Sequence, residues 1–425
     1  MIKSIDLKKK SYAIYGLGLT GKSVIKFLYK KGNKNFFTWD DNINNKNNKK
    51  KKLFSNILDQ VDFIILSPGI DIFRSSFKNK LLENKKKIIT DLDLFFIENN
   101  VEKSIVITGT NGKSTTCSLI NHILKKNSFL TCLAGNIGKP ILNIPFSKYK
   151  TYIIEASSFQ LAYSKFIKPK YALILNITKD HLDWHRSKKN YIQSKFKIFE
   201  NQSKNQIAIL GDKKLKSLFK TKRYSSKLKF LGKDVVPKEK IENEYLKLDT
   251  NSKNIEFAYA ISKYFKIKKS FFFKSIKSFK GLPHRQEIFL KRKKVKFIND
   301  SKATTFESTK SALINYNNII WILGGLPKLN DKIEIKKYKN KIIKTYIIGR
   351  YSHFFKKQLQ NQVNYTIKKN LESVVKIIIK NLKNYKTNTT VLFSPASASF
   401  DQYRNFVERG NYFKKIVNYY AKKSL

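Results

Sequence analysis

Short apolar runs alternate with amphipathic segments over the first hundred residues. An apolar run at 11–15 leads into a glycine-rich turn, and residues 22–31 then carry apolar side chains at helical spacing before Gly32. Further apolar runs at 36–39 and 61–66 predict two more strands. Strands that alternate with helices indicate a parallel sheet covered on both faces, so we predict an α/β fold.

The same alternation continues along the rest of the chain. A second unit begins with a strand at 104–107, and a third begins near Gly281. The strands expected in the third unit lie at 296–298, 319–323, 345–348 and 390–393. The lysine-dense stretch 213–250 is expected to form peripheral strands and loops. We therefore predict three domains, which span 1–99, 100–281 and 282–425.

Charge is the most unusual feature of the composition. The 425 residues include 87 Lys and Arg against 30 Asp and Glu, which gives a formal net charge of +57. Such an excess suggests a polyanionic partner such as nucleic acid or a membrane surface. Only eight of the basic residues are Arg, the residue that grips phosphate and reads guanine through paired contacts. A chain rich in Lys, Asn, Ile, Phe and Tyr is typical of A/T-rich codons. We favour compositional drift and expect no specific nucleic-acid partner, with selected polyanion binding as the alternative.

The remaining composition indicates a globular protein of a reducing compartment. With 41% hydrophobic and 13% aromatic residues, the chain can bury ordinary cores despite its charge. Two cysteines, Cys117 and Cys132, cannot form a disulfide framework. The first ten residues lack the apolar core of a signal peptide, and no apolar run approaches the roughly 18 residues that cross a bilayer. We therefore expect a soluble, cytoplasmic protein without membrane insertion.

A first glycine motif lies between the first predicted strand and helix. Gly16, Gly18 and Gly21 have the spacing of the dinucleotide-binding fingerprint, and Asp40 lies about where a ribose-binding carboxylate belongs. The pattern alone permits a Rossmann-like nucleotide site, including that of an NAD-dependent dehydrogenase, or a turn that serves packing only. It does not identify the nucleotide.

A second glycine motif is more specific. Residues 108–115 read Thr-Gly-Thr-Asn-Gly-Lys-Ser-Thr, follow an apolar strand and open a predicted helix. Backbone N–H groups of such a loop cradle phosphates, Lys113 reaches the β- and γ-phosphates, and Ser114 can ligate Mg²⁺. The loop departs from the general Walker spacing because position 107, where the first glycine would fall, is Ile. We predict an ATP-binding loop that begins at Gly109.

This loop resembles that of the Mur ligase and folylpolyglutamate synthase superfamily of ATP-dependent amide-bond ligases. Further segments match the same superfamily in order: 135–140, 155–161, 176–183, Tyr191 with Lys195, 281–285, 299–304 and 394–402. The resemblance covers essentially the whole chain. A folylpolyglutamate synthase would lack the unit that holds Gly16–Gly21. The chain also has no Asn/Asp-Pro-Arg signature of the diaminopimelate- or lysine-adding branch, and the alanine-adding branch has a different N-terminal loop. The segments 67–70 and 157–161 favour the branch that adds D-glutamate.

The resemblance implies a fold, a reaction and partners. The N- and C-terminal domains would be Rossmann-like, and the central domain would hold a P-loop ATPase-like parallel sheet. The ligase would add D-Glu to UDP-N-acetylmuramoyl-L-alanine (UDP-MurNAc-L-Ala) through an acyl phosphate, in peptidoglycan precursor synthesis. We expect a monomer whose partners are ATP and these two small molecules. Because separate domains would supply the ATP and amino-acid contacts, we also expect closure on binding.

The resemblance also implies two Mg²⁺ sites and a modified lysine. Ser114 and Glu155 would hold the first Mg²⁺, and His181 would ligate the second. Lys195 would react with CO₂, which converts a repelling ammonium into a carbamate that can ligate Mg²⁺. This reaction needs a neutral amine and therefore a lowered lysine pKa.

Other roles are carried over by position. The implied catalytic residues are Lys113, Lys195, His181 and Lys302. The implied ATP-binding residues are Gly109, Thr110, Asn111, Gly112, Lys113, Ser114, Thr115, Asn254, Arg285 and Asp300. The implied UDP-substrate residues are Leu19, Thr20, Asp40, Ser67, Pro68, Gly69 and Asn136. The implied D-Glu residues are Thr304, Lys328, Ser399 and Phe406. One departure concerns the adenine side, where the family's His-Asn-x-x-Asn element begins with Thr250.

Overall fold

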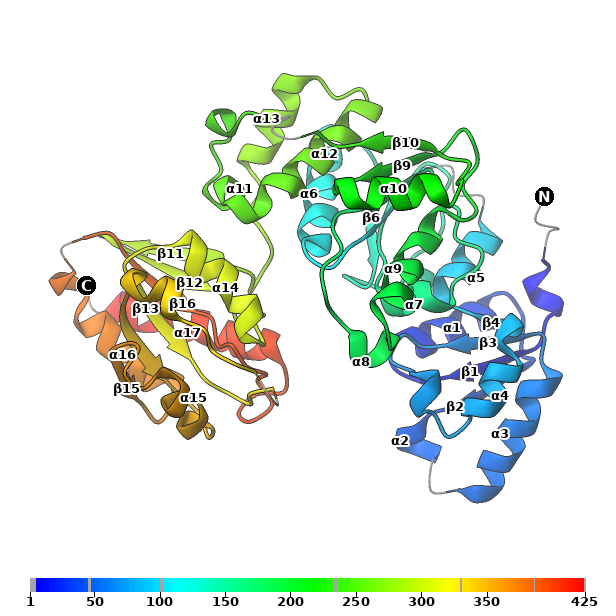
Figure 1. Ribbon diagram of the computed structural model, residues 1–425, viewed down its shortest axis with the longest axis horizontal. Helices are drawn as coiled ribbons and strands as arrows, with labels where there is room; N and C mark the ends of the chain where they lie inside the picture. Colours follow the sequence, from blue (N-terminus) through cyan, green and yellow to red (C-terminus); the bar gives the residue numbers. More distant parts are fainter. Residues whose placement is uncertain are drawn as a thin grey trace. The chain divides into compact units, whose positions relative to one another are not determined.

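The chain folds into two compact units in the computed structural model, which describes residues 5–44, 47–99, 103–232, 236–328, 331–385 and 387–423. The first unit comprises Met1–Ile241 and Lys253–Lys277, and the second comprises Glu242–Ser252 and Ser278–Leu425. The first holds two sheets and the second holds one (Figure 1). The domain boundaries expected from the sequence stay predictions, since the first unit groups two sheets together.

The N-terminal sheet consists of four parallel strands in the order β2-β1-β3-β4. Its strands are β1 (Tyr12–Tyr15), β2 (Phe36–Trp39), β3 (Phe63–Leu66) and β4 (Ile88–Ile89). The helices of this region are α1 (Leu19–Lys30), α2 (Asp41–Asn44), α3 (Asn48–Gln60), α4 (Lys78–Glu83) and α5 (Asp91–Glu98). Side chains of β1 alternate between two apolar clusters, one shared with α3 and α4 and the other with α1 and α5. Helices therefore cover both faces, as the alternating pattern predicts.

The central sheet has six parallel strands in the order β10-β9-β8-β5-β7-β6. Its strands are β5 (Ser104–Thr108), β6 (Thr131–Gly135), β7 (Thr151–Glu155), β8 (Tyr171–Ile174), β9 (Ile207–Leu210) and β10 (Lys227–Phe230). The helices are α6 (Lys113–Lys126), α7 (Ser158–Tyr163), α8 (Leu182–His185), α9 (Lys188–Phe196), α10 (Lys213–Thr221), α12 (Ser252–Tyr264) and α13 (Lys269–Lys277). Leu142 contacts the apolar clusters of both this sheet and the N-terminal one, which joins the two within the first unit.

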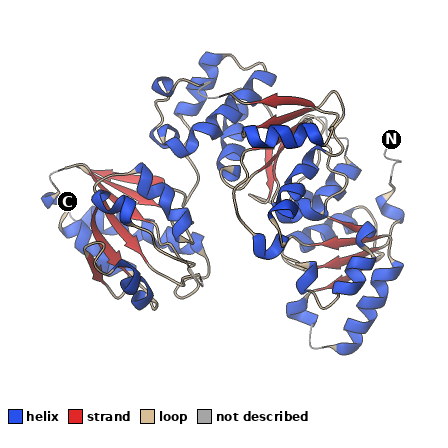
Figure 2. Cartoon of the chain, in the orientation of Figure 1, coloured by secondary structure: helices blue, strands red, loops and turns tan. Residues whose placement is uncertain are grey.

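The sheet of the second unit is mostly parallel, with the order β11-β12-β16-β13-β14-β15 and an antiparallel β11–β12 pair (Figure 2). Its strands are β11 (Glu287–Arg292), β12 (Val295–Asn299), β13 (Ile319–Leu323), β14 (Ile342–Ile347), β15 (Tyr365–Ile367) and β16 (Thr389–Phe393). The helices are α11 (Glu244–Lys247), α14 (Phe306–Asn315), α15 (Ser352–Leu359), α16 (Leu371–Lys380) and α17 (Phe406–Lys423). α16 and α17 pack on one face, and α14 and α15 pack on the other.

The α/β class and its parallel sheets are confirmed. One expectation is wrong, because residues 213–221 form the helix α10 rather than a strand or loop. Its buried Leu215 and Phe219 lie four positions apart, so both face the same side of a helix and pack on the central sheet. This apolar packing stabilises the helix despite the surrounding lysines. Within the described ranges, no helix is both long and apolar enough to cross a bilayer.

Candidate active site

The predicted ATP-binding loop, residues 109–112, connects the carboxyl end of β5 to the first residue of α6 and is called the phosphate loop below. Gly112 has φ +83°, and a Cβ atom there would lie 2.3 Å from Asn254 Oδ1. Only glycine fits this position, because the backbone is left-handed and the side chain of Asn254 occupies the space. Asn254 also accepts a hydrogen bond from Thr116 Oγ1 at 3.1 Å. The structure thus places Asn254 against the phosphate loop, while its adenine-side role stays a prediction.

Two lysines of the site share one backbone acceptor. Lys113 Nζ and Lys195 Nζ each donate to the carbonyl oxygen of Gly109 at 2.8 Å. Lys113 also donates to the carbonyl oxygen of Thr110 at 2.8 Å. Two amino groups on one oxygen are close enough to repel each other when both are charged.

Lys195 lies in a site that favours its neutral form. Its side chain is 1% exposed and its Nζ lies 4.6 Å from the centre of the Tyr191 ring. Burial, followed by the charge of Lys113, lowers the pKa of Lys195 well below its usual value. This environment meets the chemical requirement for reaction of the amine with CO₂.

Glu155 is the last residue of β7, and only one of its two carboxylate oxygens has a hydrogen-bond donor among the described residues. Its side chain is 2% exposed, and Oε1 accepts a hydrogen bond from Asn136 Nδ2 at 2.9 Å. Oε2 is buried and has no hydrogen-bond partner among the described residues. A buried carboxylate oxygen without a donor is costly unless a cation or water binds it, and oxygen is the donor that Mg²⁺ prefers. The residues present therefore fit a divalent cation.

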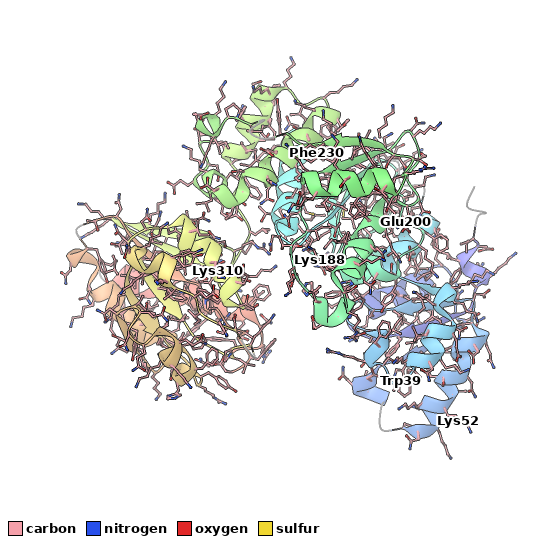
Figure 3. The ribbon with its side chains drawn as sticks, in the orientation of Figure 1. Trp39, Lys52, Lys188, Glu200, Phe230 and Lys310 are labelled. Atoms are coloured by element: carbon pink, nitrogen blue, oxygen red, sulfur yellow. The ribbon has the colours of Figure 1, made fainter. Side chains whose placement is uncertain are left out.

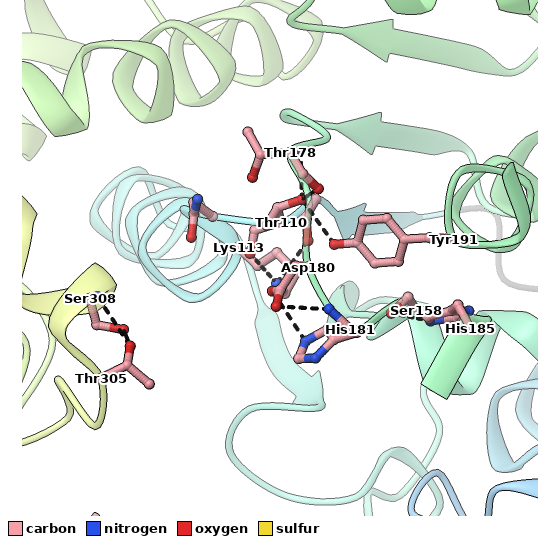
Figure 4. A network of polar contacts seen from close by, with 12 residues as sticks. Thr110, Lys113, Ser158, Thr178, Asp180, His181, His185, Tyr191, Thr305 and Ser308 are labelled. Carbon is pink, nitrogen blue, oxygen red and sulfur yellow. Dashed lines mark hydrogen bonds and ion pairs between the residues drawn. The ribbon is translucent and has the colours of Figure 1, made fainter. Parts of the chain in front are cut away.

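His181 directly precedes α8 and has a left-handed backbone conformation, with φ +51°. Its Nε2 lies 3.3 Å from Asp180 Oδ2 (Figure 4). The centre of its ring lies 4.7 Å from the centre of the Phe159 ring. Burial, helped by the charge of Lys113, lowers the pKa of His181. The imidazole is therefore neutral near pH 7, which is the form that ligates metals.

His185 is not part of this set. Its Nε2 lies 3.0 Å from Ser158 Oγ, and burial is the largest of the causes that lower its pKa to about 4. Across the described ranges, no three His, Cys, Asp or Glu side chains are grouped to hold a metal. The expected ligand set draws instead on Ser114, Glu155, His181 and modified Lys195.

The first glycine motif forms a second candidate subsite at the carboxyl ends of β1, β2 and β3. The backbone N–H of Leu17 donates to Asp40 Oδ2 at 2.6 Å, and Ser67 Oγ donates to the Gly16 carbonyl at 2.7 Å. Leu19, at the first position of α1, is 80% exposed. The structure thus brings Leu19 and Thr20 to the same edge as Asp40 and the turn 67–69.

Comparisons with known proteins agree over nearly the whole chain. The Mur ligase middle domain family matches residues 107–272. A UDP-N-acetylmuramoylalanine–D-glutamate ligase from Rickettsia felis is 34% identical over 442 residues, which cover 96% of this chain and 97% of the relative. Relatives of the same name from the Wolbachia of Brugia malayi and from Buchnera aphidicola are 34% and 35% identical, each over 96% of this chain and 96% and 97% of their own lengths. The chain belongs to the Mur ligase family.

Solved structures agree on the fold. A MurF ligase from Thermotoga maritima in complex with ADP has a TM-score of 0.59 at 14% identity and covers 99% of this chain and 100% of its own. The UDP-N-acetylmuramate–alanine ligase from the same organism has a TM-score of 0.58 at 16% identity and covers 96% and 99%. This Mur ligase therefore has the three-sheet α/β architecture of its family.

The second unit of the Mur ligase carries the remaining expected ATP residues. Asp300 is buried, and its carboxylate accepts hydrogen bonds from the backbone N–H of Gln286 at 3.1 Å and from Ser394 Oγ at 2.7 Å. Burial raises the pKa of Asp300 to about 7. The Nε of Arg285 is buried and unpaired among the described residues.

The expected D-Glu residues lie on neighbouring segments of the same unit. Lys302 Nζ lies 5.4 Å from the centre of the Phe406 ring. The loops that carry Lys328 and Ser399 are joined by paired backbone hydrogen bonds between Leu326 and Ala398, at 2.9 and 3.0 Å. Thr304 is half-buried and follows the segment of Lys302 along the chain.

Sequence reasoning missed Arg409, which is 2% exposed. Its guanidinium donates to Ser301 Oγ, to the Ser301 carbonyl and to the carbonyls of Ser397 and Ala398, at 2.8 to 3.2 Å. Arg409 therefore holds two of the Mur ligase's candidate site loops in place. The one feature of the sequence that could have pointed to Arg409 is the rarity of arginine, since only eight of the 87 basic residues are Arg.

Proposed function

We propose that this Mur ligase joins the carboxylate of UDP-MurNAc-L-Ala to the amine of D-Glu at the expense of ATP. The observation that carries the proposal is the match over nearly the whole chain to D-glutamate ligases. The phosphate loop, the buried lysine and the spare oxygen of Glu155 support the same conclusion. With small molecules as partners, we expect a monomer that acts in the cytoplasm.

The reaction needs an activated carboxylate, because a free carboxylate is a poor acyl donor. The γ-phosphoryl group of ATP passes to the substrate carboxylate and forms an acyl phosphate. The amine of D-Glu then attacks the acyl carbon, and the tetrahedral intermediate expels phosphate. Such a transfer depends mainly on positioning and charge neutralisation. Lys113 would exchange the Gly109 carbonyl for phosphate oxygens, and Lys302 would neutralise the γ-phosphate.

We assign the role of binding Mg²⁺ to Ser114, Glu155, His181 and carbamylated Lys195, which are called the metal-facing groups below. Mg²⁺, when bound, supplies positive charge to the phosphate and carboxylate oxygens. On Lys195, the neutral Nζ forms a bond to the carbon of CO₂ and loses one proton. The resulting carbamate carries a negative charge beside Lys113, which stabilises it.

The two organic substrates are assigned to different segments. The UDP moiety is assigned to Leu19, Thr20, Asp40 and the turn 67–69, with Asn136 nearer the sugar. D-Glu is assigned to Thr304, Lys328, Ser399 and Phe406. ATP is assigned to the phosphate loop, Asn254, Arg285 and Asp300.

Phosphate release from ATP tests the function. We expect release only when both UDP-MurNAc-L-Ala and D-Glu are present, and L-Glu should not replace D-Glu. Equal release with L-Ala, with L-Lys or without an amino acid would exclude this assignment.

The carbamate has its own test. Lys195→Ala should abolish activity, and added acetate or bicarbonate should restore part of it by supplying a carboxylate in place of the carbamate. A ¹³C resonance of a carbamate should appear in the wild-type protein under ¹³CO₂ and be missing from the variant. Full activity of Lys195→Ala would exclude the role.

A further inference from the structure

The hydroxyl group of Thr110 lies where three segments of the candidate site meet. Thr110 Oγ1 accepts a hydrogen bond from the backbone N–H of Thr178 at 3.0 Å and lies 2.9 Å from the hydroxyl oxygen of Tyr191 (Figure 4). Thr110 belongs to the phosphate loop, Thr178 belongs to the loop after β8, and Tyr191 lies on α9. One side chain thus connects elements that are 68 and 81 positions apart in sequence.

Each of these segments carries one of the proposed metal-facing groups. The loop after β8 continues to His181, and the phosphate loop leads directly to Ser114. Tyr191 precedes Lys195 by one helical turn, so both side chains lie on the same face of α9. The position of each group relative to the others therefore depends on how these three segments are held together.

Asn176 provides a second tie between two of the segments. Its Oδ1 accepts a hydrogen bond from the backbone N–H of Asn111 at 2.9 Å, and its Nδ2 donates to the Asn111 carbonyl at 3.0 Å. The backbone N–H of Thr110 also donates to the Asn176 carbonyl at 3.0 Å. The phosphate loop is thus fixed to the loop after β8 by several bonds. On α9, the Tyr191 hydroxyl contacts the side chain of Thr110, next to the bond from Lys195 Nζ to the Gly109 carbonyl.

Tyr191 is suited to this role because it is only 1% exposed. Its ring faces Lys195 Nζ at 4.6 Å, so a change to Phe keeps the ring in place and removes only the hydroxyl. Because this hydrogen bond is already formed before ligands bind, the side chains need not rearrange during the reaction. Its loss should matter, since small displacements of reacting groups reduce reaction rates strongly.

We propose that Thr110 and Tyr191 are positioning residues that keep the phosphate loop in register with His181 and Lys195. The kinetic part of this inference rests on the proposed function. The structural part does not, because it can be measured in protein without nucleotide or metal.

Four single variants separate the contributions. Tyr191→Phe removes one hydroxyl, Thr110→Val removes the shared acceptor, and Thr110→Ser keeps it. Tyr152→Phe is the matched control, because it removes a hydroxyl that accepts from the backbone N–H of Ser147 at 2.7 Å on the other end of the central sheet. The double variant Tyr191→Phe with Thr110→Val tests whether the two residues act through one bond.

Amide hydrogen exchange of the free protein is the first measurement. Exchange at Thr110 and Asn111 should be about three- to tenfold faster in Tyr191→Phe and faster still in Thr110→Val, as expected for the loss of one or two hydrogen bonds. Thr110→Ser and Tyr152→Phe should leave these two amides unchanged. Unchanged exchange in Tyr191→Phe, or an equal increase in Tyr152→Phe, would overturn the proposal.

Kinetics provide the second measurement. In Tyr191→Phe, the Mg²⁺ concentration for half-maximal phosphate release should rise and kcat should fall, by about three- to tenfold each, with the KM for D-Glu unchanged. The double variant should be no worse than Thr110→Val, because both changes remove the same bond. Additive losses, or a matching rise in the KM for D-Glu, would contradict positioning. If the wild-type enzyme showed no D-Glu-dependent release, the proposed function would fail, and the exchange data would still decide the structural part.

Discussion

The carboxyl group of Asp300 is held in an environment that opposes its charge. It is buried, and its two hydrogen-bond donors are the neutral Gln286 backbone and the Ser394 hydroxyl. Loss of solvent therefore raises the pKa of Asp300 to about 7. A residue expected to contact ATP is thus close to half-protonated at neutral pH.

This shift makes a pH-dependent prediction for Asp300→Asn. Because the folded-state pKa lies above the unfolded value of about 3.9, the wild type loses stability as pH rises from about 4 to about 7 and is level above that. Asn stays neutral, so the variant should be more stable than the wild type at pH 8, by about 2–4 kcal/mol at most, and similar at pH 4. Urea unfolding at both pH values measures this, and an equal difference at both would contradict the shifted pKa.

The four hydrogen bonds of Arg409, all to hydroxyl or carbonyl oxygens, allow a prediction about stability. Its guanidinium donates to the hydroxyl and carbonyl of Ser301 and to two carbonyls of the 397–398 segment. Arg409→Lys keeps the charge but cannot reach all four acceptors, so we expect a loss of about 2–4 kcal/mol of stability. Chemical denaturation measures the loss. Arg404→Lys, at an exposed position of the same region, is the control and should change stability by less than about 0.5 kcal/mol.

At the scale of elements, Gly112 allows the left-handed turn that leads from the phosphate loop into α6. A methyl group at Gly112 would meet Asn254 Oδ1 at 2.3 Å on a backbone with φ +83°. Gly112→Ala should therefore displace the loop and weaken ATP binding by at least about tenfold, with about 1–3 kcal/mol lost from the fold. Calorimetry with Mg-ATP measures the binding. Gly69→Ala, where a Cβ meets nothing within 4 Å, is the control for stability and should leave the unfolding midpoint unchanged.

The elements also show where sequence reasoning works and where it stops. β5 and the loop that follows were predictable, because a fully buried apolar strand and a glycine-rich turn are local signals. The tie between Thr110, Thr178 and Tyr191 was not, because it depends on which strands are neighbours in the sheet. Helix α10 was missed for another reason: its two buried residues stand among lysines that obscure the helical pattern.

At the scale of the whole molecule, the charge of +57 far exceeds what the candidate site uses. The proposed anion contacts involve Lys113, Lys302, Lys328 and Arg285. Most other lysines project from the surface, as Lys52 on α3 and Lys188 on α9 do in Figure 3. We therefore expect the excess to act as a diffuse field around the fold rather than as a built binding surface.

A diffuse field and a selected nucleic-acid site respond differently to salt. Attraction by counterion release alone should give measurable binding of a short single-stranded oligonucleotide at about 50 mM salt and lose several orders of magnitude by about 200 mM. It should also show no preference for base sequence, since sequence is read by contacts to base edges, which scattered surface lysines do not provide. Fluorescence anisotropy across a salt series measures both properties, and heparin serves as a control that carries charge without bases. If an oligonucleotide bound tightly at physiological salt while heparin failed to displace it, the excess lysine would have a selected partner and compositional drift would no longer account for it.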